Sequence, residues 1–275
     1  MSTRFASRGR LCYFREHNTM DWDDHWAHRI HPGLYQAPAQ LGFLSFLADY
    51  LPKNGPILEA GCGTGVVVNK LRLLGFDCSG VDNAAKTIAA VRNIMPDLPV
   101  TTGNVLALDA PDGHYSAYVS LGVVEHREQG PEPFLEEAHR VLAEDGIAIF
   151  TVPFFNGLRR LKASCGLFST PPGRHETFYQ YAFTAEEFGS ILKAKGFRIV
   201  EQRGYDPVKG LRDEIRMLRW LSTPAVTGGS TSQLATPATH PSPTGHLRSI
   251  KTWIENQRWF HPIAAHMLAT ICKKA

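Results

Sequence analysis

The chain has 275 residues, of which 43% are hydrophobic and 20% charged, which is typical of a soluble globular domain with additions. A formal net charge of +3 is too small to predict nucleic-acid binding, which needs basic residues clustered on one face. The five cysteines are scattered without C-x-x-C spacing, so we expect no zinc site and reduced thiols in a cytoplasmic protein.

Residues 1–37 form an N-terminal arm that is rich in aromatic residues and histidine, including Trp22, Trp26 and Tyr35. The arm lacks the apolar segment of a signal peptide, and no apolar run reaches the ~20 residues needed to span a bilayer. Two interpretations stay open. The arm is either a loosely packed segment whose aromatic side chains dock on the main domain, or a lid that closes over a ligand.

Residues 38–221 alternate between short apolar runs and amphipathic stretches, which predicts strands alternating with helices. The expected strands are 57–60, 78–81, 100–102, 117–120, 147–152 and 197–200. The expected helices are 41–50, 67–74, 84–94, 133–142 and one that begins at Thr184 and ends at Gly196. This order predicts an α/β fold, a Rossmann-like seven-stranded and mostly parallel sheet with helices on both faces.

The C-terminal part contains three further segments. Residues 208–221 form a basic amphipathic helix, which indicates either weak contact with a membrane surface or a solvated helix packed on the sheet edge. Residues 222–247 are rich in Ser, Thr, Pro and Gly, and we expect this insert to be disordered. Residues 248–275 would return a helix and the last strand, over 267–272, to the same domain.

The strongest local signal is the glycine-rich run from Ile57 to Gly65, which reads ILEAGCGTG. It follows a predicted strand and precedes a helix, the place where open α/β sheets bind ligands. Asp82 ends the next strand, about where a carboxylate meets ribose hydroxyls. A dinucleotide fingerprint would have a third glycine where Val66 stands, so the run disfavours a dehydrogenase.

These motifs resemble those of class I S-adenosylmethionine (SAM) dependent methyltransferases, especially the small-molecule group that includes the ubiquinone-biosynthesis enzymes. The matching segments are ILEAGCGTG, GVDNA, SLGVVEH and AHRVLAEDGIAIFTVP, and the resemblance covers roughly residues 40–200 and the end of the chain. It implies SAM as cofactor, an antiparallel last strand, and methyl transfer to a small-molecule acceptor, at oxygen rather than nitrogen or carbon.

The resemblance also assigns residues to the cofactor site. Gly61, Gly63 and Gly65 would line the methionine half, and Glu59 would hold the loop or the amino group. Asp82 would accept from both ribose hydroxyls while facing a hydrated cleft. The remaining expected cofactor contacts are Asn83, Asn104, Val105 and Leu121. Asn104 stands where the family usually has Asp, and it is alternatively a plain turn residue.

His126 is the candidate catalytic residue, because an oxygen nucleophile must lose its proton and a histidine at the mouth of the site can accept it. The alternative is a hydrogen-bonding loop anchor. Glu125, His126 and His139 do not have the further ligands that a metal centre needs, so we expect no metal. His175 and Glu176 precede an aromatic stretch that either lies over the substrate or belongs to the core.

Two other functions compete with small-molecule methylation. A non-catalytic binding module is disfavoured by the intact glycine loop and Asp82. Methylation of a macromolecule is disfavoured because SLGVVEH replaces the Asn/Asp-Pro-Pro-Tyr/Phe motif of amino-methylating nucleic-acid enzymes, and because protein arginine methyltransferases need a second glutamate there. The identity of the acceptor and the oligomeric state carry no sequence signal.

Overall fold

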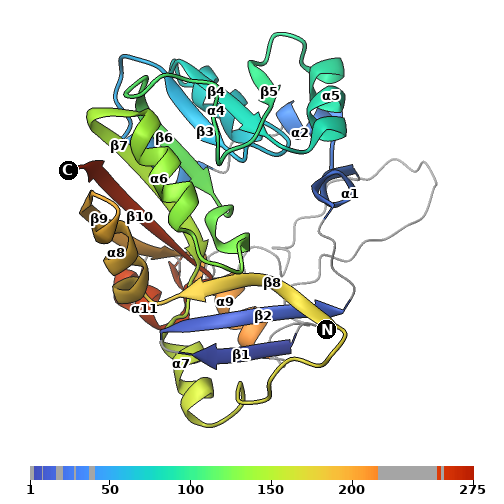
Figure 1. The fold of residues 1–275 in the computed structure, drawn as a ribbon, viewed down its shortest axis with the longest axis vertical. Coiled ribbons are helices and arrows are strands. Elements are labelled where there is room, and N and C mark those ends of the chain that lie inside the picture. Colours follow the sequence, from blue (N-terminus) through green and yellow to red (C-terminus); the bar gives the residue numbers. More distant parts are fainter. Residues whose placement is uncertain are drawn as a thin grey trace, which may run out of the picture.

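A computed structural model describes residues 3–7, 9–16, 21–27, 29–36, 41–215, 253–254 and 257–275. Within this part of the chain the strands form a seven-stranded sheet with the order β5-β4-β3-β6-β7-β10-β9 and a three-stranded sheet with the order β1-β2-β8 (Figure 1). The basic helix predicted over 208–221 is observed over Pro207–Glu214, and the backbone at Ile215 is extended, so the helix ends earlier than predicted. Residues 216–221 and the predicted insert 222–247 lie outside the described residues, and the insert stays a prediction.

The strands of the large sheet are β3 (Ile57–Ala60), β4 (Cys78–Asp82), β5 (Val100–Thr102), β6 (Tyr115–Leu121), β7 (Leu142–Pro153), β9 (Phe197–Tyr205) and β10 (Met267–Lys274). Those of the small sheet are β1 (Thr3–Ser7), β2 (Arg10–Glu16) and β8 (Glu176–Phe183). The helices are α1 (Trp22–Ala27), α2 (Pro32–Gln36), α3 (Leu41–Ala48), α4 (Val66–Leu73), α5 (Ala85–Ile94), α6 (Glu132–Val141), α7 (Gly157–Ser164), α8 (Ala185–Ala194), α9 (Pro207–Glu214) and α11 (His261–Ala264), with short 3-10 turns η1 (Val124–His126) and η4 (Arg258–Phe260).

The strands of the large sheet run in the predicted relative directions. Strands β3 to β7 pair in parallel. Strand β10 runs antiparallel to both of its neighbours, β7 and β9. The Rossmann-like seven-stranded, mostly parallel sheet and its antiparallel last strand are therefore confirmed.

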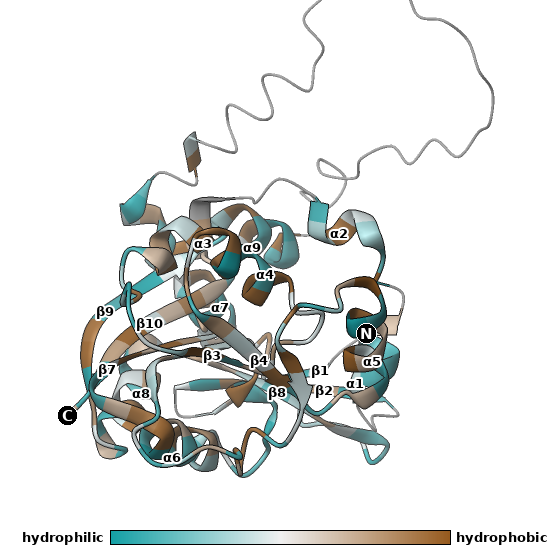
Figure 2. Ribbon diagram, turned by 90° about the horizontal axis from the view of Figure 1, so that it is seen from above, coloured by the Kyte–Doolittle hydropathy of each residue, from teal (hydrophilic) through white to brown (hydrophobic). Residues whose placement is uncertain are grey.

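Helices cover both faces of this sheet because successive strand residues point to opposite sides. Ile57 packs in the core with α3, α4 and α5, whereas its neighbour Leu58 packs in the core with α6 and α8. Both side chains are fully buried. The helices are hydrophobic on part of their circumference and hydrophilic on the rest, as Figure 2 shows.

The described residues of the N-terminal arm include two strands that pair with a distant part of the chain. Its first residues form β1 and β2, an antiparallel pair, and β2 pairs in turn with β8. Leu11 and Ala182 of this small sheet are fully buried and pack with Phe155 and Phe168. The sequence did not predict these strands, because their pairing partner lies far along the chain.

The small sheet lies over the carboxyl-terminal ends of the central strands. Phe154, directly after β7, forms an isolated bridge with Phe183 of β8, and β8 also contacts η1. Figure 1 shows the small sheet beside that end of the large sheet, with α1 between the small sheet and α5. Two segments distant in sequence, 10–16 and 176–183, therefore flank the place where ligands bind in this fold.

Candidate functional site

The loop after β3 turns through three glycines in the left-handed region. Their φ angles are +79° at Gly61, +49° at Gly63 and +69° at Gly65, values that strain any residue with a β-carbon. A β-carbon at Gly61 would also lie 2.4 Å from Cγ2 of Val123. The glycines therefore allow other groups to pack directly against the backbone of this loop at the carboxyl edge of the sheet.

Glu59 supports this loop from beneath. It is 3% exposed, and its Oε2 accepts a hydrogen bond of 3.1 Å from the N–H of Val68. Helix α4 begins after Gly65, which offers no side-chain cap, so Glu59 satisfies one of the free N–H groups of the first turn. Burial raises the pKa of Glu59 to about 8, and the charge of Asp82 acts in the same direction.

Asp82 ties the glycine loop to the end of β4. Its Oδ2 accepts from the N–H of Gly63 at 2.7 Å, and its Oδ1 accepts from the N–H of Ala84 at 2.9 Å. The residue is only 7% exposed. The expectation that Asp82 faces a hydrated cleft is therefore wrong, because the carboxylate is packed against backbone donors on both sides.

The other predicted cofactor residues follow at the same edge of the sheet. Asn83 is exposed after β4, Asn104 and Val105 follow β5, and Leu121 ends β6. The Oδ1 of Asn104 accepts from the N–H of Leu106 at 3.0 Å, which is the geometry of a turn residue. The parallel strands bring these positions to one edge of the sheet, although the first and last of them, Glu59 and Leu121, are 62 positions apart in the sequence.

His126 lies in η1, after β6, and its ring is fixed on one side. Its Nδ1 is 2.9 Å from the carbonyl oxygen of Tyr179. A carbonyl only accepts, so Nδ1 carries the hydrogen and Nε2 keeps a free lone pair in the neutral ring. Burial lowers the pKa of His126 to about 4, which keeps the ring neutral at physiological pH. The anchor is present, and the same bond leaves Nε2 able to accept a proton.

Helix α1 of the arm docks on the start of α5. Oδ1 of Asp23 accepts from the N–H of Thr87 at 2.8 Å and from its Oγ1 at 3.0 Å. The N-cap position of α5 is Ala84, which provides no side-chain cap. Asp23 therefore caps α5 from another helix and holds α1 beside the end of β4.

The aromatic side chains of α1 cover the glycine loop and His126. A β-carbon at Gly63 would lie 2.8 Å from two ring atoms of Trp26. The Trp22 ring meets the His126 ring edge-on, with centroids 4.9 Å apart. The Tyr179 ring also contacts His126, with centroids 5.1 Å apart, and the guanidinium of Arg15 lies 3.3 Å from the centroid of the Tyr179 ring.

The sequence did not predict the parts that Asp23 and Arg15 play at this site, nor the contact of Tyr179 with His126. A signal for α1 was present, since Trp22 and Trp26 are four residues apart and therefore share one helix face. Nothing in the sequence said that this face would meet Gly63 and His126. That information depends on the small sheet, which sets where the arm lies.

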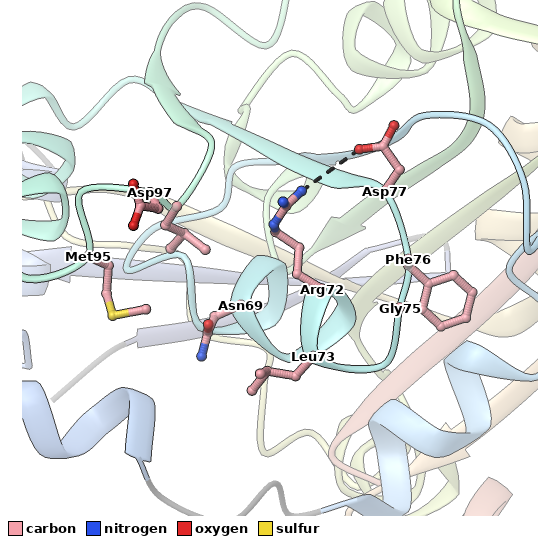
Figure 3. A pocket seen from close by; sticks show the side chains of 9 residues that line it. Asn69, Arg72, Leu73, Gly75, Phe76, Asp77, Met95 and Asp97 are labelled. Atoms are coloured by element: carbon pink, nitrogen blue, oxygen red, sulfur yellow. Dashed lines mark ion pairs between the residues drawn. The ribbon is translucent and has the colours of Figure 1, made fainter.

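A separate hollow of about 540 Å³ lies at the opposite edge of the large sheet (Figure 3). It is lined by the end of α4, the start of β4 and the turn before β5, with Arg72 and Asp77 forming an ion pair of 3.8 Å across it. None of the predicted cofactor residues lines this hollow. It therefore does not belong to the site at the glycine loop.

The described residues offer neither a metal centre nor a membrane span. They contain no group of three or more His, Cys, Asp or Glu side chains that could hold a metal ion. No helix among them is long and apolar enough to cross a membrane.

The sequence matches the family model described as a methyltransferase domain over residues 26–202. A relative from Mycolicibacterium smegmatis, named a probable S-adenosylmethionine-dependent methyltransferase, is 28% identical over 57% of this chain and 57% of its own length. A ubiquinone biosynthesis O-methyltransferase from Chromobacterium violaceum is 26% identical over 62% of this chain and 76% of its own. The chain spans little more than half the length of the mycobacterial relatives it matches.

Solved structures agree on the fold. A SAM dependent methyltransferase from Archaeoglobus fulgidus superimposes with a TM-score of 0.52 at 17% identity, over 92% of this chain and 98% of that one. A chain of the Haloferax volcanii complex between the Trm112 methyltransferase activator and a methyltransferase gives 0.55 at 16% identity, over 94% and 99%. At such identities the likeness supports the architecture alone.

Proposed function

This chain belongs to the methyltransferase domain family, and we propose that it transfers a methyl group from SAM to an oxygen atom of a small-molecule acceptor. The observation that carries the proposal is the bond between Gly63 and Asp82, which joins the glycine loop to the acidic end of the next strand. This pairing places glycine backbone beside a carboxylate, without the glycine at position 66 that a pyrophosphate cradle needs.

In this proposal each predicted cofactor residue has a defined part. Gly61, Gly63 and Gly65 line the methionine half, and Glu59 holds their loop through α4. Asp82 accepts from the ribose hydroxyls with the lone pairs that Gly63 and Ala84 leave free. Asn83, Asn104, Val105 and Leu121 surround the adenine and the methionine end.

The residues present fit such a cofactor. The glycines of the loop carry no side chains that would keep a ligand off the backbone, and the atoms nearest to a β-carbon placed at Gly63 are those of the Trp26 ring. A ring in that place can slide off the loop or stack on a bound ligand, whereas a strand or a charged side chain would block it. We therefore propose that α1 acts as a lid over the cofactor, hinged where Asp23 meets Thr87.

SAM supplies an electrophilic methyl group on a sulfonium. The chain's own residues would orient the acceptor, exclude water and take a proton from the reacting oxygen. Nε2 of His126 is the group suited to hold that proton, because the bond from Nδ1 to Tyr179 fixes the tautomer and the ring direction. Trp22, packed on the same ring, would shield it from solvent.

Oxygen as the methyl-accepting atom is supported by the names of two relatives. One is the ubiquinone biosynthesis O-methyltransferase from Chromobacterium violaceum. The other is a malonyl-[acyl-carrier protein] O-methyltransferase from Geobacter sulfurreducens, 29% identical over 65% of this chain. We propose a hydroxyl acceptor, because His126 would have no catalytic task toward an acceptor that is already ionised.

Titration calorimetry with SAM, its demethylated product S-adenosylhomocysteine (SAH), and NAD tests the cofactor. We expect both sulfur compounds to bind and NAD to give no heat. A screen for SAM consumption against phenols, sugars and quinone precursors then tests the acceptor class. Binding of NAD without binding of SAM or SAH would end the proposal.

A further inference from the structure

A buried carboxyl group beside His126 has an oxygen without a partner. Glu125 is 2% exposed, and its Oε2 makes no hydrogen bond in the described part of the chain. A buried polar atom left unpaired costs free energy, and such atoms are rare in folded proteins. Neither the glycine loop nor the predicted cofactor residues provide a hydrogen-bond partner for Oε2 of Glu125.

Glu125 lies among other polar groups at the carboxyl ends of the central strands. The residue follows β6 and lies beside Gly122, where a β-carbon would be 3.5 Å from Oε1, an ordinary van der Waals distance. Thr151 of β7 is 1% exposed, and its hydroxyl group lies beside that of Tyr205. These polar groups share the carboxyl ends of neighbouring parallel strands, where this architecture binds its ligands.

The distance between Glu125 and His126 is informative. Oε1 of Glu125 lies 3.9 Å from Nε2 of His126. This is too long for a direct hydrogen bond, but one oxygen atom about 2.8 Å from each could bridge them. Nε2 is also the ring nitrogen that the bond to Tyr179 leaves free. Nε2 of His126 and Oε1 of Glu125, which belongs to the same carboxyl group as the unpartnered Oε2, are therefore within hydrogen-bond reach of one bridging oxygen atom.

We propose that Glu125 is a positioning residue that, together with His126, binds the hydroxyl group of the acceptor. The proposal rests on the methyl-transfer function above and names the group that the site recognises. The acceptor hydroxyl donates its hydrogen to Nε2 of His126 and accepts a hydrogen bond from the protonated carboxyl group of Glu125. One oxygen lone pair is then left to attack the methyl carbon.

The step balances without a further reactant. The oxygen–methyl bond forms as the sulfur–methyl bond breaks, and the electron pair of the broken bond stays on sulfur. The hydroxyl proton passes to Nε2 of His126, which becomes an imidazolium and later releases the proton to water. Glu125 keeps its own proton throughout and only orients the oxygen.

This arrangement requires a protonated carboxyl group at Glu125, and the burial of Glu125 favours that form. Burial raises the pKa of Glu125 to about 8, so the carboxyl group is neutral at physiological pH. The titratable groups around it are His126 on the same turn, Tyr179 on β8 and Tyr205 on β9. Arg15 and His25 lie beyond His126 and lower its pKa further.

The first test needs no acceptor. In protein labelled with ¹⁵N-histidine and saturated with SAH, the Nε2 resonance of His126 should show an inflection near pH 8, where Glu125 ionises. Glu125→Gln should abolish that inflection and leave the resonance at the position of the low-pH form. Glu128, exposed in the same loop, gives the matched control, and Glu128→Gln should keep the inflection.

The second test uses phenol as a minimal hydroxyl probe and anisole, its methyl ether, as the matched ligand. Phenol titrated into the SAH complex should move the His126 Nε2 resonance, and anisole should not. Glu125→Leu should weaken phenol binding about fivefold, the loss of one hydrogen bond, whereas Glu125→Gln retains a donor and stays within about twofold. Glu125→Leu should change the melting temperature little, because it removes the unpartnered Oε2 together with the hydrogen bond of the carboxyl group to its own backbone.

The outcomes separate this inference from the proposed function. Absence of SAH binding would defeat the proposed function before phenol is added. With SAH bound, equal shifts from phenol and anisole, unchanged phenol affinity in Glu125→Leu, or no inflection near pH 8 would each overturn the role of Glu125. A lower melting temperature of Glu125→Leu with unchanged phenol affinity would identify a purely structural residue.

Discussion

The backbone N–H of Gly63 donates a 2.7 Å hydrogen bond to Oδ2 of Asp82, joining the glycine loop after β3 to the end of β4. The two residues are 19 positions apart, and each lies at the carboxyl edge of its strand. The bond makes the shape of the loop depend on the acidic residue. Asp82 is therefore a structural residue of the ligand-free protein as well as the proposed ribose ligand.

Replacing Asp82 should destabilise the protein before any cofactor is added. Asp82→Ala leaves the N–H groups of Gly63 and Ala84 without acceptors, which should cost about 2 kcal/mol and lower the melting temperature by about 4–8 °C. Asn83→Ala, at the exposed neighbouring position, is the control and should melt like the wild type. The melting temperatures of both ligand-free variants are measured by calorimetry. Equal melting temperatures would contradict the structural role of Asp82.

Two glycines with similar backbone and different surroundings isolate the effect of Trp26. A β-carbon at Gly63, with φ +49°, would lie 2.8 Å from the Trp26 ring, whereas one at Gly75, with φ +87°, would have nothing within 4 Å. Both alanine variants should lose about 1 kcal/mol for the left-handed backbone. Only Gly63→Ala should also weaken SAH binding in calorimetry, by about tenfold, because its methyl group keeps the ligand away from the loop backbone.

Trp26→Ala in the Gly63→Ala background provides the second half of that test. Removing the ring should recover part of the stability, because the clash disappears. It should not recover SAH affinity, because the methyl group still covers the backbone of the loop. Full recovery of both would mean that Trp26, and not the cofactor, is what requires glycine at this position.

The docking of α1 on α5 should depend on Asp23 and not on the neighbouring Asp24. Asp23→Ala removes the cap of Thr87 and should cost about 1 kcal/mol, the usual loss for an N-cap. Asp24→Ala, exposed on the same helix, should have little effect. Hydrogen exchange followed by mass spectrometry should show faster exchange across 22–27 and at Thr87 in the first variant alone.

The sequence was sufficient for the large sheet because its signals are local. The predicted strands 57–60, 100–102 and 147–152 each lie directly between glycine or proline residues, and amphipathic helices follow 57–60 and 78–81, so periodicity and turn residues identify these elements. The glycine loop and Asp82 were placed correctly at the ends of β3 and β4 for the same reason.

The small sheet and the burial of Asp82 could not be found in this way. Residues 10–16 pair with 176–183, and no local pattern encodes a partner about 165 positions away. The place of Asp82 at a strand end predicts hydration, but whether such a carboxylate meets water depends on the backbone donors that the loop and the residues after β4 present to it. The orphaned Oε2 of Glu125 is likewise a property of packing.

Glu59 should give the stability of the protein a pH dependence opposite to that of an ordinary carboxylate. Its pKa is raised from 4.5 to about 8 in the folded chain, so the folded state holds a proton that the unfolded state releases. This contribution is fully present below pH 4.5 and is lost as the pH rises through about 8. Glu59→Gln should flatten that part of the stability curve, measured by urea unfolding. A curve as steep as that of the wild type would show that Glu59 is ionised in the folded protein.

His126 can be tested as base and as anchor with two substitutions. His126→Ala removes both roles, whereas the amide of His126→Asn can still donate to the carbonyl of Tyr179 and thus keeps the anchor. If His126 is the base, both variants should lower kcat by roughly 10²–10⁴ with SAH affinity nearly unchanged. Activity retained by the asparagine variant alone would identify an anchor.

The pH profile of the wild type gives an independent criterion for the base. An ordinary histidine would make kcat/KM fall below about pH 6.5. The pKa of His126 is lowered to about 4 by burial, so its lone pair stays available well below that point. We expect the acid limb of the profile near pH 4 and its removal in His126→Asn, which has no titrating ring. A limb at about pH 6.5 in the wild type, or an acid limb near pH 4 that persists unchanged in the variant, would assign the proton to another group.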